Sequence, residues 1–159
     1  MSYRIHEHVL LSPLTTFRIG GPARWLIDVM DVNEIKRAIA FAREQGVLYT
    51  VIAGGSNVLV ADAGVSGVVI HLYDGRHRIT GEYVYAEAGA PLETIIRESA
   101  AQSLTGLESL AGIPGSIGGA VRGNAGAFGT EIADVVEAVR AYNTRTVNLY
   151  DFEKGTCEF

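Results

Sequence analysis

The sequence is short of cysteine and of positive charge. Its 159 residues include one cysteine, Cys157, and 13 lysines and arginines against 18 aspartates and glutamates, which gives a formal net charge of −5. A single thiol excludes an internal disulfide and a cysteine metal cluster, and it is typical of a protein from a reducing cytoplasm. The deficit of basic residues argues against a nucleic-acid partner, because phosphate contacts require a basic surface.

Long hydrophobic runs are also lacking. No apolar stretch is long enough to cross a bilayer, and residues 1–8 lack the apolar core of a signal peptide. The four histidines show no metal-ligand spacing with the cysteine or with carboxylates. Hydrophobic residues make up 48% and charged residues 19%, an ordinary globular composition. We therefore expect a cytoplasmic protein with no membrane insertion and no metal site.

The hydrophobic patterns predict an α+β fold of two lobes: a lead-in over 1–23, a first lobe over 24–75 and a second over 76–159. The helix of the first lobe should begin at Asp31, which has capping-box spacing to Glu34, and end near Gly46. The strands expected in this lobe cover 24–29, 49–53, 58–60 and 68–72. Trp25 is expected in the core.

In the second lobe, residues 73–81 are polar and predict a turn, and Pro91 stands at a position where a helix can open. The other elements expected there are a strand over 83–88, a helix ending by Gly106, a hairpin of strands 135–142 and 146–150, and a short last helix capped by Asp151. Between helix and hairpin, residues 107–129 show little secondary-structure signal.

The first of two glycine clusters is Gly54-Gly55-Ser56-Asn57, directly after an expected buried strand. Adjacent glycines allow positive φ, and successive N–H groups in such a turn form an anion-binding concavity. A phosphate group is the ligand that such a loop suits, although a tight turn with a Ser-Asn cap explains the same residues equally well. The loop is neither a Walker loop nor a Rossmann fingerprint, since it lacks Gly-Lys-Ser/Thr and a third glycine.

The second cluster extends over 111–129 and is dense in glycine, with Arg122 as its one charged residue. Long loops of this kind are functional or disordered, and disorder conflicts with apolar residues that need burial. Those residues are Ile113, Ile117, Val121 and Phe128. A neutral loop suits a flat aromatic ligand lying against backbone, whereas a purely structural crossover between lobes is the alternative. Together the two clusters predict a ligand with phosphate and aromatic parts, such as FAD.

Four strings occur in the order and at the spacing of one bacterial enzyme family. They are Thr15–Ala23 (TTFRIGGPA), Gly54–Leu59 (GGSNVL), Gly112–Ala120 (GIPGSIGGA) and Asn124–Gly129 (NAGAFG). Through them the chain resembles the UDP-N-acetylenolpyruvoylglucosamine reductase family, also called UDP-N-acetylmuramate dehydrogenase, from about Leu14 to Phe159. The Gly-Gly-Ser-Asn loop is shared with the wider vanillyl-alcohol oxidase and p-cresol methylhydroxylase superfamily, and the later strings are more specific to the reductases.

The resemblance implies a two-lobed FAD-binding domain of the p-cresol methylhydroxylase type. It further implies that NADPH reduces FAD and that the flavin reduces UDP-N-acetylglucosamine enolpyruvate, a UDP-sugar, to UDP-N-acetylmuramate for peptidoglycan. No histidine lies in either glycine cluster, so non-covalent FAD is expected. By match, the cofactor-binding residues are Gly54, Gly55, Ser56, Asn57, Ile113, Pro114, Gly115, Ser116, Gly118, Gly119, Asn124 and Gly126.

One departure from the family limits the assignment. A Tyr-Arg-x-Ser motif with the catalytic arginine, and the later serine and glutamate, are expected beyond Phe159, so no residue here is assigned a catalytic role. Arg122 is the best candidate for a charged group near the cofactor or substrate, while Arg18 and Arg24 suit a surface role at least as well. An FAD-dependent oxidase of the same superfamily and a non-catalytic flavin-binding module remain as alternatives.

Overall fold

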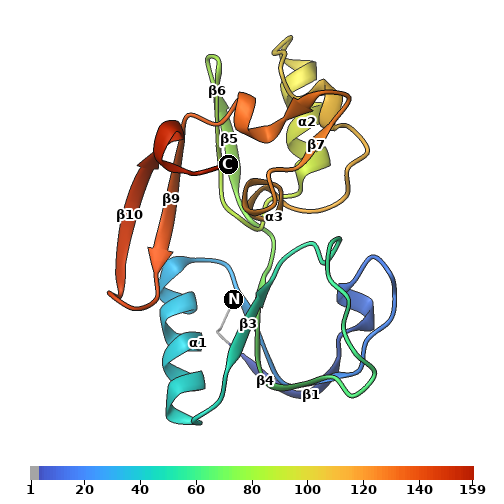
Figure 1. The fold of residues 1–159 in the computed structure, drawn as a ribbon, viewed down its shortest axis with the longest axis vertical. Coiled ribbons are helices and arrows are strands. Elements are labelled where there is room, and N and C mark those ends of the chain that lie inside the picture. Colours follow the sequence, from blue (N-terminus) through green and yellow to red (C-terminus); the bar gives the residue numbers. More distant parts are fainter. Residues whose placement is uncertain (1–3) are drawn as a thin grey trace.

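The computed structural model describes residues 4–159 and confirms the α+β class (Figure 1). In Figure 1 a sheet with helix α1 occupies one end of the molecule, and helices α2 and α3 with a β-ribbon occupy the other. The predicted division at residue 75 falls between strands β4 and β5. No helix within residues 4–159 is long and apolar enough to span a membrane.

A four-stranded sheet in the order β1-β2-β4-β3 forms the first lobe. Its strands are β1 (Ile5–Leu10), β2 (Pro22–Val29), β3 (Tyr49–Ile52) and β4 (Val65–Leu72). β2, β4 and β3 run parallel, and β1 is antiparallel to β2. The strand predicted over 58–60 is wrong, because these residues lie in a loop. The apolar run there reflects packing, since Val60 lies against the core cluster of Leu11, Leu26 and Val69.

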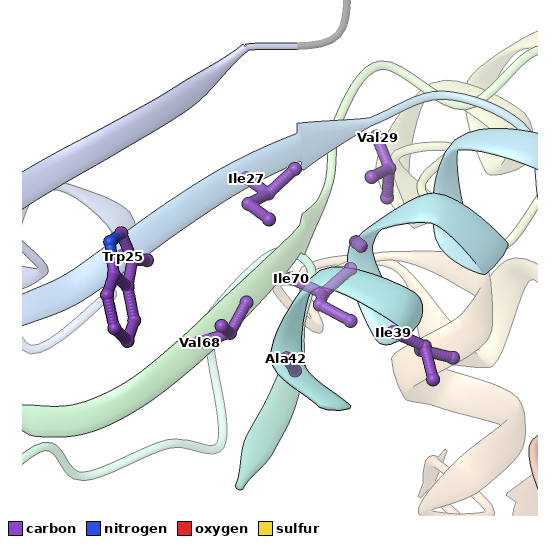
Figure 2. Close-up of a cluster of buried hydrophobic side chains, with 8 residues drawn as sticks. Trp25, Ile27, Val29, Ile39, Ala42, Val68 and Ile70 are labelled. Atoms are coloured by element: carbon purple, nitrogen blue, oxygen red, sulfur yellow. The ribbon is translucent and has the colours of Figure 1, made fainter. Parts of the chain in front are cut away.

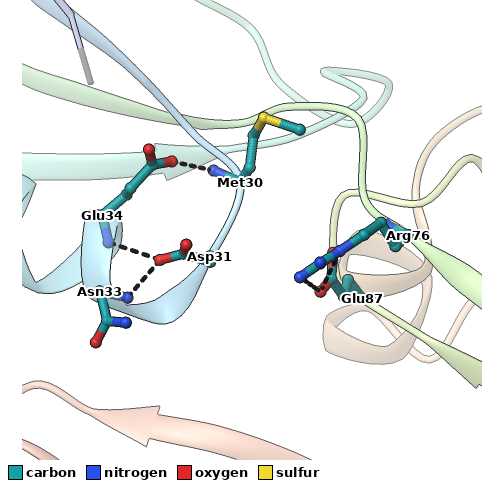
Figure 3. Close-up of polar contacts among 6 residues, drawn as sticks. All are labelled: Met30, Asp31, Asn33, Glu34, Arg76 and Glu87. Carbon is teal, nitrogen blue, oxygen red and sulfur yellow. Dashed lines mark hydrogen bonds and ion pairs between the residues drawn. The ribbon is translucent and has the colours of Figure 1, made fainter. Parts of the chain in front are cut away.

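Helix α1 (Val32–Glu44) begins where predicted. The Asp31 carboxylate accepts from the backbone N–H groups of Asn33 and Glu34 at 2.7 and 3.0 Å (Figure 3). Glu34 returns a contact one residue further back than expected, accepting from the N–H of Met30 at 2.8 Å. Gly46 follows the helix with φ of +64°, as a glycine after a helix C-terminus should.

The main core lies between α1 and the sheet (Figure 2). Apolar residues at helical spacing on α1 meet alternate residues of β2 and β4, which all point to one face of the sheet. The cluster comprises Trp25, Ile27, Val29, Ala38, Ile39, Ala42, Val68 and Ile70. Trp25 is 7% exposed, so its predicted core position is confirmed. Its ring meets the edge of Phe41 at 5.5 Å between centroids.

The second lobe opens with a two-stranded ribbon, β5 (His77–Thr80) and β6 (Tyr83–Ala86), and continues into helix α2 (Leu92–Ala101). The turn predicted over 73–81 is therefore wrong for 77–80, where pairing with β6 overrides the polar sequence. Pro91 is the N-cap of α2, and the helix ends before Gly106.

The glycine-dense stretch is ordered around short elements. These are η2 (Glu108–Leu110), α3 (Ile117–Arg122), β7 (Gly126–Ala127), β8 (Thr130–Glu131) and η3 (Ile132–Asp134). They enclose a core of Leu92, Ile96, Leu110, Ala120 and Ile132, against which Ile113, Ile117 and Val121 pack. The expected burial of Phe128 is wrong: it is 94% exposed at the tip of the β7–β8 turn.

The predicted hairpin is confirmed as β9 (Ala138–Asn143) and β10 (Asn148–Glu153). Asp151 does not cap a helix. It lies within β10, and its carboxylate pairs with Arg140 on β9 at 2.6 Å; η4 (Lys154–Thr156) follows. The hairpin runs beside α1 in Figure 1, and Arg43 of that helix donates to the carbonyl of Thr144 at 2.6 Å. The second lobe is thereby tied back to the first.

Candidate cofactor-binding site

The two glycine clusters meet in space. A Cβ atom on Gly54 would lie 2.8 Å from the Cα of Gly115 and 3.2 Å from the backbone nitrogen of Ser116. Real Cβ atoms do not approach backbone so closely, and neither backbone can yield without moving its loop. Gly54 is therefore required for the contact, and the structure brings Gly54, Gly55, Ser56 and Asn57 together with Gly115 and Ser116.

The lead-in supports the first cluster from the other side. Gly55 has φ of +60°, and a side chain there would overlap the carbonyl oxygen of Leu14. Thr16 donates its N–H to the Gly55 carbonyl at 3.1 Å, and Gly21 donates to Ala61 at 3.0 Å. The sequence predicts residues 1–23 to be a lead-in outside the cofactor lobe, and the structure instead shows them in contact with the first cluster. The motif Thr15–Ala23 could have indicated this contact, because its glycines permit the close approach of two backbones.

The second cluster is anchored to α2. The carbonyl of Gly115 accepts from the N–H of Leu92 at 3.0 Å, and Ile117 and Gly118 donate to Ala90 and Ala88 at 2.9 and 2.8 Å. Gly118 has no room for a side chain, since a Cβ there would lie 2.6 Å from the Cβ of Ala88.

Glu93 on α2 holds both the start of this loop and a neighbouring arginine. Its carboxylate accepts from the N–H of Gly112 at 3.3 Å and from Arg97 at 2.7 Å. The hydrogen bond from Arg97, followed by that from Gly112, lowers the pKa of Glu93 below its usual range. The ionised carboxylate therefore fixes the first glycine of the loop relative to the helix.

Ser116 acts as a helix cap. It is 3% exposed, and its Oγ accepts from the N–H of Gly119 at 3.3 Å at the start of α3. Ser56 lies against the same loop, since its Oγ stands 2.7 Å from where a Cβ of Gly115 would be. Gly115 has φ of +131°, which only glycine adopts readily. The positive φ of Gly115 and its lack of a side chain together make room for the Ser56 hydroxyl.

A row of hydrogen-bond donors at this junction is unused. Among the contacts within residues 4–159, no hydrogen bond uses the backbone N–H groups of residues 54–59 or the side chains of Ser56 and Asn57. The N–H groups of Gly115 and Ser116 are likewise without an acceptor in that part of the chain. Consecutive free N–H groups in a positive-φ turn suit an anion such as a pyrophosphate, so these residues fit the phosphate part of FAD.

Asn124 and Gly126 lie in a separate turn. The Asn124 carboxamide donates to Glu131 at 2.6 Å and accepts from the N–H of Ala133 at 3.3 Å. Gly126 pairs with Glu131 in the β7–β8 ribbon. These contacts give both residues a local structural role, and their predicted contact with the cofactor stays a prediction, as it does for Ile113, Pro114, Gly118 and Gly119.

The arginines separate clearly. Arg24 stacks on Trp25, and its guanidinium carbon lies 4.0 Å from the ring centroid. This contact gives Arg24 a structural role on the surface of the first lobe. Arg122 is the last residue of α3. At 1.5 Å per residue it lies about 9 Å along the helix from Ser116. Arg18 lies in the lead-in segment that contacts the first glycine cluster.

Two surface hollows lie away from the glycine clusters. The larger, about 980 Å³, is bounded by the ends of α2 and β9 and by η4. The smaller, about 290 Å³, lies on the β5–β6 ribbon beside Arg78 and Tyr85. Neither is lined by a residue of the two clusters, and we favour the clusters because they combine free N–H donors with glycine-dependent geometry.

Comparison with known proteins places this geometry in context. Residues 24–146 match the family model "FAD binding domain". UDP-N-acetylenolpyruvoylglucosamine reductase of Synechococcus sp. is 42% identical over 142 residues, covering 88% of this chain and 46% of the relative. The Solibacter usitatus reductase is 44% identical over 149 residues, covering 94% and 47%. The chain thus spans about half the length of the curated relatives it matches.

Solved structures give the same picture. The UDP-N-acetylenolpyruvylglucosamine reductase of Thermus caldophilus aligns with a TM-score of 0.76 and 36% identity, over 97% of this chain and 54% of that one. A cholesterol oxidase of Brevibacterium sterolicum aligns with a TM-score of 0.67 and 16% identity, over 96% and 33%. At so low an identity the second likeness concerns the fold alone.

Proposed function

From the premise that this chain belongs to the FAD binding domain family, we propose that it binds FAD non-covalently where its two glycine clusters meet. The proposal assigns the pyrophosphate to residues 54–57 and the segment of Gly115 and Ser116, and the remaining cofactor contacts to the rest of the second cluster. Bound FAD supplies hydride-transfer chemistry, and the protein supplies its placement and the surrounding charge.

The observation that supports this most strongly is the contact of Gly54 with Gly115. It joins two loops that were separately expected to hold different parts of one ligand, and it leaves their N–H groups free. Where such a donor is shielded from water, a turn that served structure alone would have supplied an acceptor within the fold, because buried backbone donors are normally paired. Gly55 and Ser116 are buried, so their surroundings offer little water.

We further propose that the whole protein is an NADPH-dependent UDP-N-acetylenolpyruvoylglucosamine reductase of the cytoplasm. The support is the 42% and 44% identity with proteins of that name. Because the chain spans about half of each of them, these residues supply the cofactor-binding part. Reduction of the UDP-sugar then depends on residues of the other half, and none of the 159 residues is assigned a catalytic role.

The likeness to cholesterol oxidase supports the shared fold and does not favour oxidase chemistry. The string Gly112–Ala120 occurs in the reductases' order together with Asn124–Gly129, and similarity to the reductases extends over most of the chain. The alternative hypothesis of a non-catalytic flavin-binding module also predicts that the chain binds FAD. It differs from the reductase hypothesis because it predicts no turnover even in the whole protein.

Visible absorption of the purified chain tests the cofactor assignment. After incubation with FAD and removal of the excess, a flavin band should remain with the protein and be released by denaturation. A folded but colourless chain would contradict the assignment for these residues. Oxidation of NADPH dependent on the enolpyruvyl UDP-sugar, measured on a chain of the relatives' full length, tests the reductase proposal separately.

A further inference from the structure

The glycine junction has donors but no formal positive charge of its own. A pyrophosphate carries negative charge, and residues 53–60 and 112–119 contain neither lysine nor arginine. Backbone N–H groups can bind such a group alone, but a nearby arginine strengthens phosphate binding through charge-assisted hydrogen bonds. The position of each arginine near the junction is therefore informative.

The lead-in segment 16–20 contacts the first glycine loop at both of its ends. At one end Thr16 donates to the carbonyl of Gly55, and at the other a Cβ on Gly20 would lie 2.8 Å from the Cβ of Val60. The next residue, Gly21, donates to Ala61 at 3.0 Å. Arg18 therefore lies in the turn between these two contacts, and the free donors of Ser56 and Asn57 lie in the part of the loop between the same two contacts.

The backbone around Arg18 is held in an unusual shape. Its φ is +58°, in the left-handed region that non-glycine residues rarely adopt. Thr15, only 4% exposed, closes the turn by donating its hydroxyl to the carbonyl of Ile19 at 3.0 Å, and Arg18 donates its own N–H to Thr15 at 3.1 Å. Backbone in this region persists where neighbouring contacts enforce it, and such positions cluster at ligand sites.

The guanidinium of Arg18 is available. The residue is exposed, and no carboxylate of residues 4–159 lies within ion-pair distance of it. The other arginines near the junction differ: Arg24 is stacked on Trp25, and Arg122 stands at the far end of α3. On these grounds we infer that Arg18 is the positive charge that binds the diphosphate group of the cofactor at the Gly54–Asn57 loop.

This inference rests on the proposed binding of FAD and adds a residue that the glycine motifs do not contain. It is tested by measuring the affinity of the chain for FAD and for riboflavin, which has the same ring system without phosphate. The variants are Arg18→Gln and Arg18→Lys. Arg145→Gln, on the turn of the β9–β10 hairpin, is a control that removes the same charge far from the junction.

We expect Arg18→Gln to weaken FAD about tenfold or more, the order expected from one lost charged hydrogen bond. Arg18→Lys should retain part of the affinity, and riboflavin should bind all forms alike. The affinity of wild-type chain for FAD should also fall more steeply with salt than that of Arg18→Gln. Arg145→Gln should match wild type in every measurement.

Four results would overturn the inference, and each has a distinct meaning. Equal loss of FAD and riboflavin in Arg18→Gln would show that the side chain only supports the loop, and unchanged binding of both would show that it has no part. Loss of binding to UDP with FAD unaffected would assign the charge to the diphosphate of the substrate instead. If wild-type chain bound neither flavin, the proposed function would fail together with the inference.

Discussion

The backbone of Gly115 lies against the one face of Gly54 from which a side chain would project, 2.8 Å from the missing Cβ. Gly54 has an ordinary φ, so this requirement for glycine is purely steric. Gly54→Ala must push the two clusters apart. We expect a loss of about 1 to 3 kcal/mol in the free energy of unfolding, typical of overpacking, and a loss of at least about tenfold in FAD affinity.

Gly155→Ala is the matched control, because no atom lies within 4 Å of a Cβ there and its φ is not positive. Denaturant unfolding followed by flavin titration measures both effects. If Gly54→Ala bound FAD as tightly as Gly155→Ala, the two clusters would not act as one site.

The buried hydroxyl of Thr15 predicts a second effect. Thr15→Val keeps the shape of the side chain and removes its hydrogen bonds to the carbonyls of Ile19 and Ser12. The free energy of unfolding should fall by about 1 kcal/mol, which corresponds to a melting temperature lower by roughly 2 to 4 °C. Thr16→Val, at an exposed position, should leave the melting temperature unchanged. Equal effects of the two substitutions would show that the Thr15 bond contributes nothing.

The core beneath the second glycine cluster should contribute strongly to stability. Leu110 is fully buried and Leu48 is 87% exposed, so the same substitution tests burial directly. Leu110→Ala should cost about 2 to 5 kcal/mol, through lost burial and the cavity left behind, and Leu48→Ala well under that. Urea denaturation curves measure the difference. Similar midpoints for the two variants would mean that the segment over 107–116 is not packed as described.

Arg76 and Glu87 predict a pH effect (Figure 3). The hydrogen bond from Arg76, 2.7 Å in length, lowers the pKa of the Glu87 carboxyl below its ordinary 4.5. A carboxyl with a lowered folded-state pKa stabilises the fold above its unfolded-state pKa, and this contribution disappears as the pH falls through the folded value. Since the two side chains are 75% and 38% exposed, the contribution at neutral pH should be well under about 1 kcal/mol.

Melting temperatures of wild type and Glu87→Gln, followed from neutral pH downward, check this. The difference between them should be constant above the ordinary carboxyl pKa and vanish in more acidic solution, and added salt should reduce it. A difference that grew on acidification would contradict the sign of the shift. Glu82→Gln, on the turn of the same ribbon, controls for a general loss of negative charge.

Local signals in the sequence were sufficient for much of the fold. The Asp31 cap of α1 and the β9–β10 hairpin depend on residues close together in the chain, and both are confirmed. The burial of Trp25, expected from its apolar strand, is confirmed as well. Phe128 was placed wrongly because hydrophobicity alone does not show whether a turn presents its tip outward. Residues 77–80 were mistaken for a turn because β6 supplies their pairing.

The candidate site shows a sharper limit. Both glycine clusters could be recognised from composition, but their contact could not, since it depends on how the second lobe docks on the first. The support from the lead-in is long-range as well, because Thr16 donates to the carbonyl of Gly55, which is far from it in the sequence. Glu93 gave no signal, because a carboxylate on a helix surface is indistinguishable in sequence from a solvated one.

The stacked backbones at the junction also constrain the order of folding. Leu14 lies on Gly55, Gly54 lies on Gly115, and Gly115 accepts from Leu92, so the site is assembled from four segments far apart in the chain. Contacts of such sequence separation form only after the intervening chain has been closed into loops, whose entropy must be lost first. The junction therefore has no local nucleus. We therefore expect the ability to bind an anion there to be acquired late in folding, after both the sheet of the first lobe and helix α2 have formed.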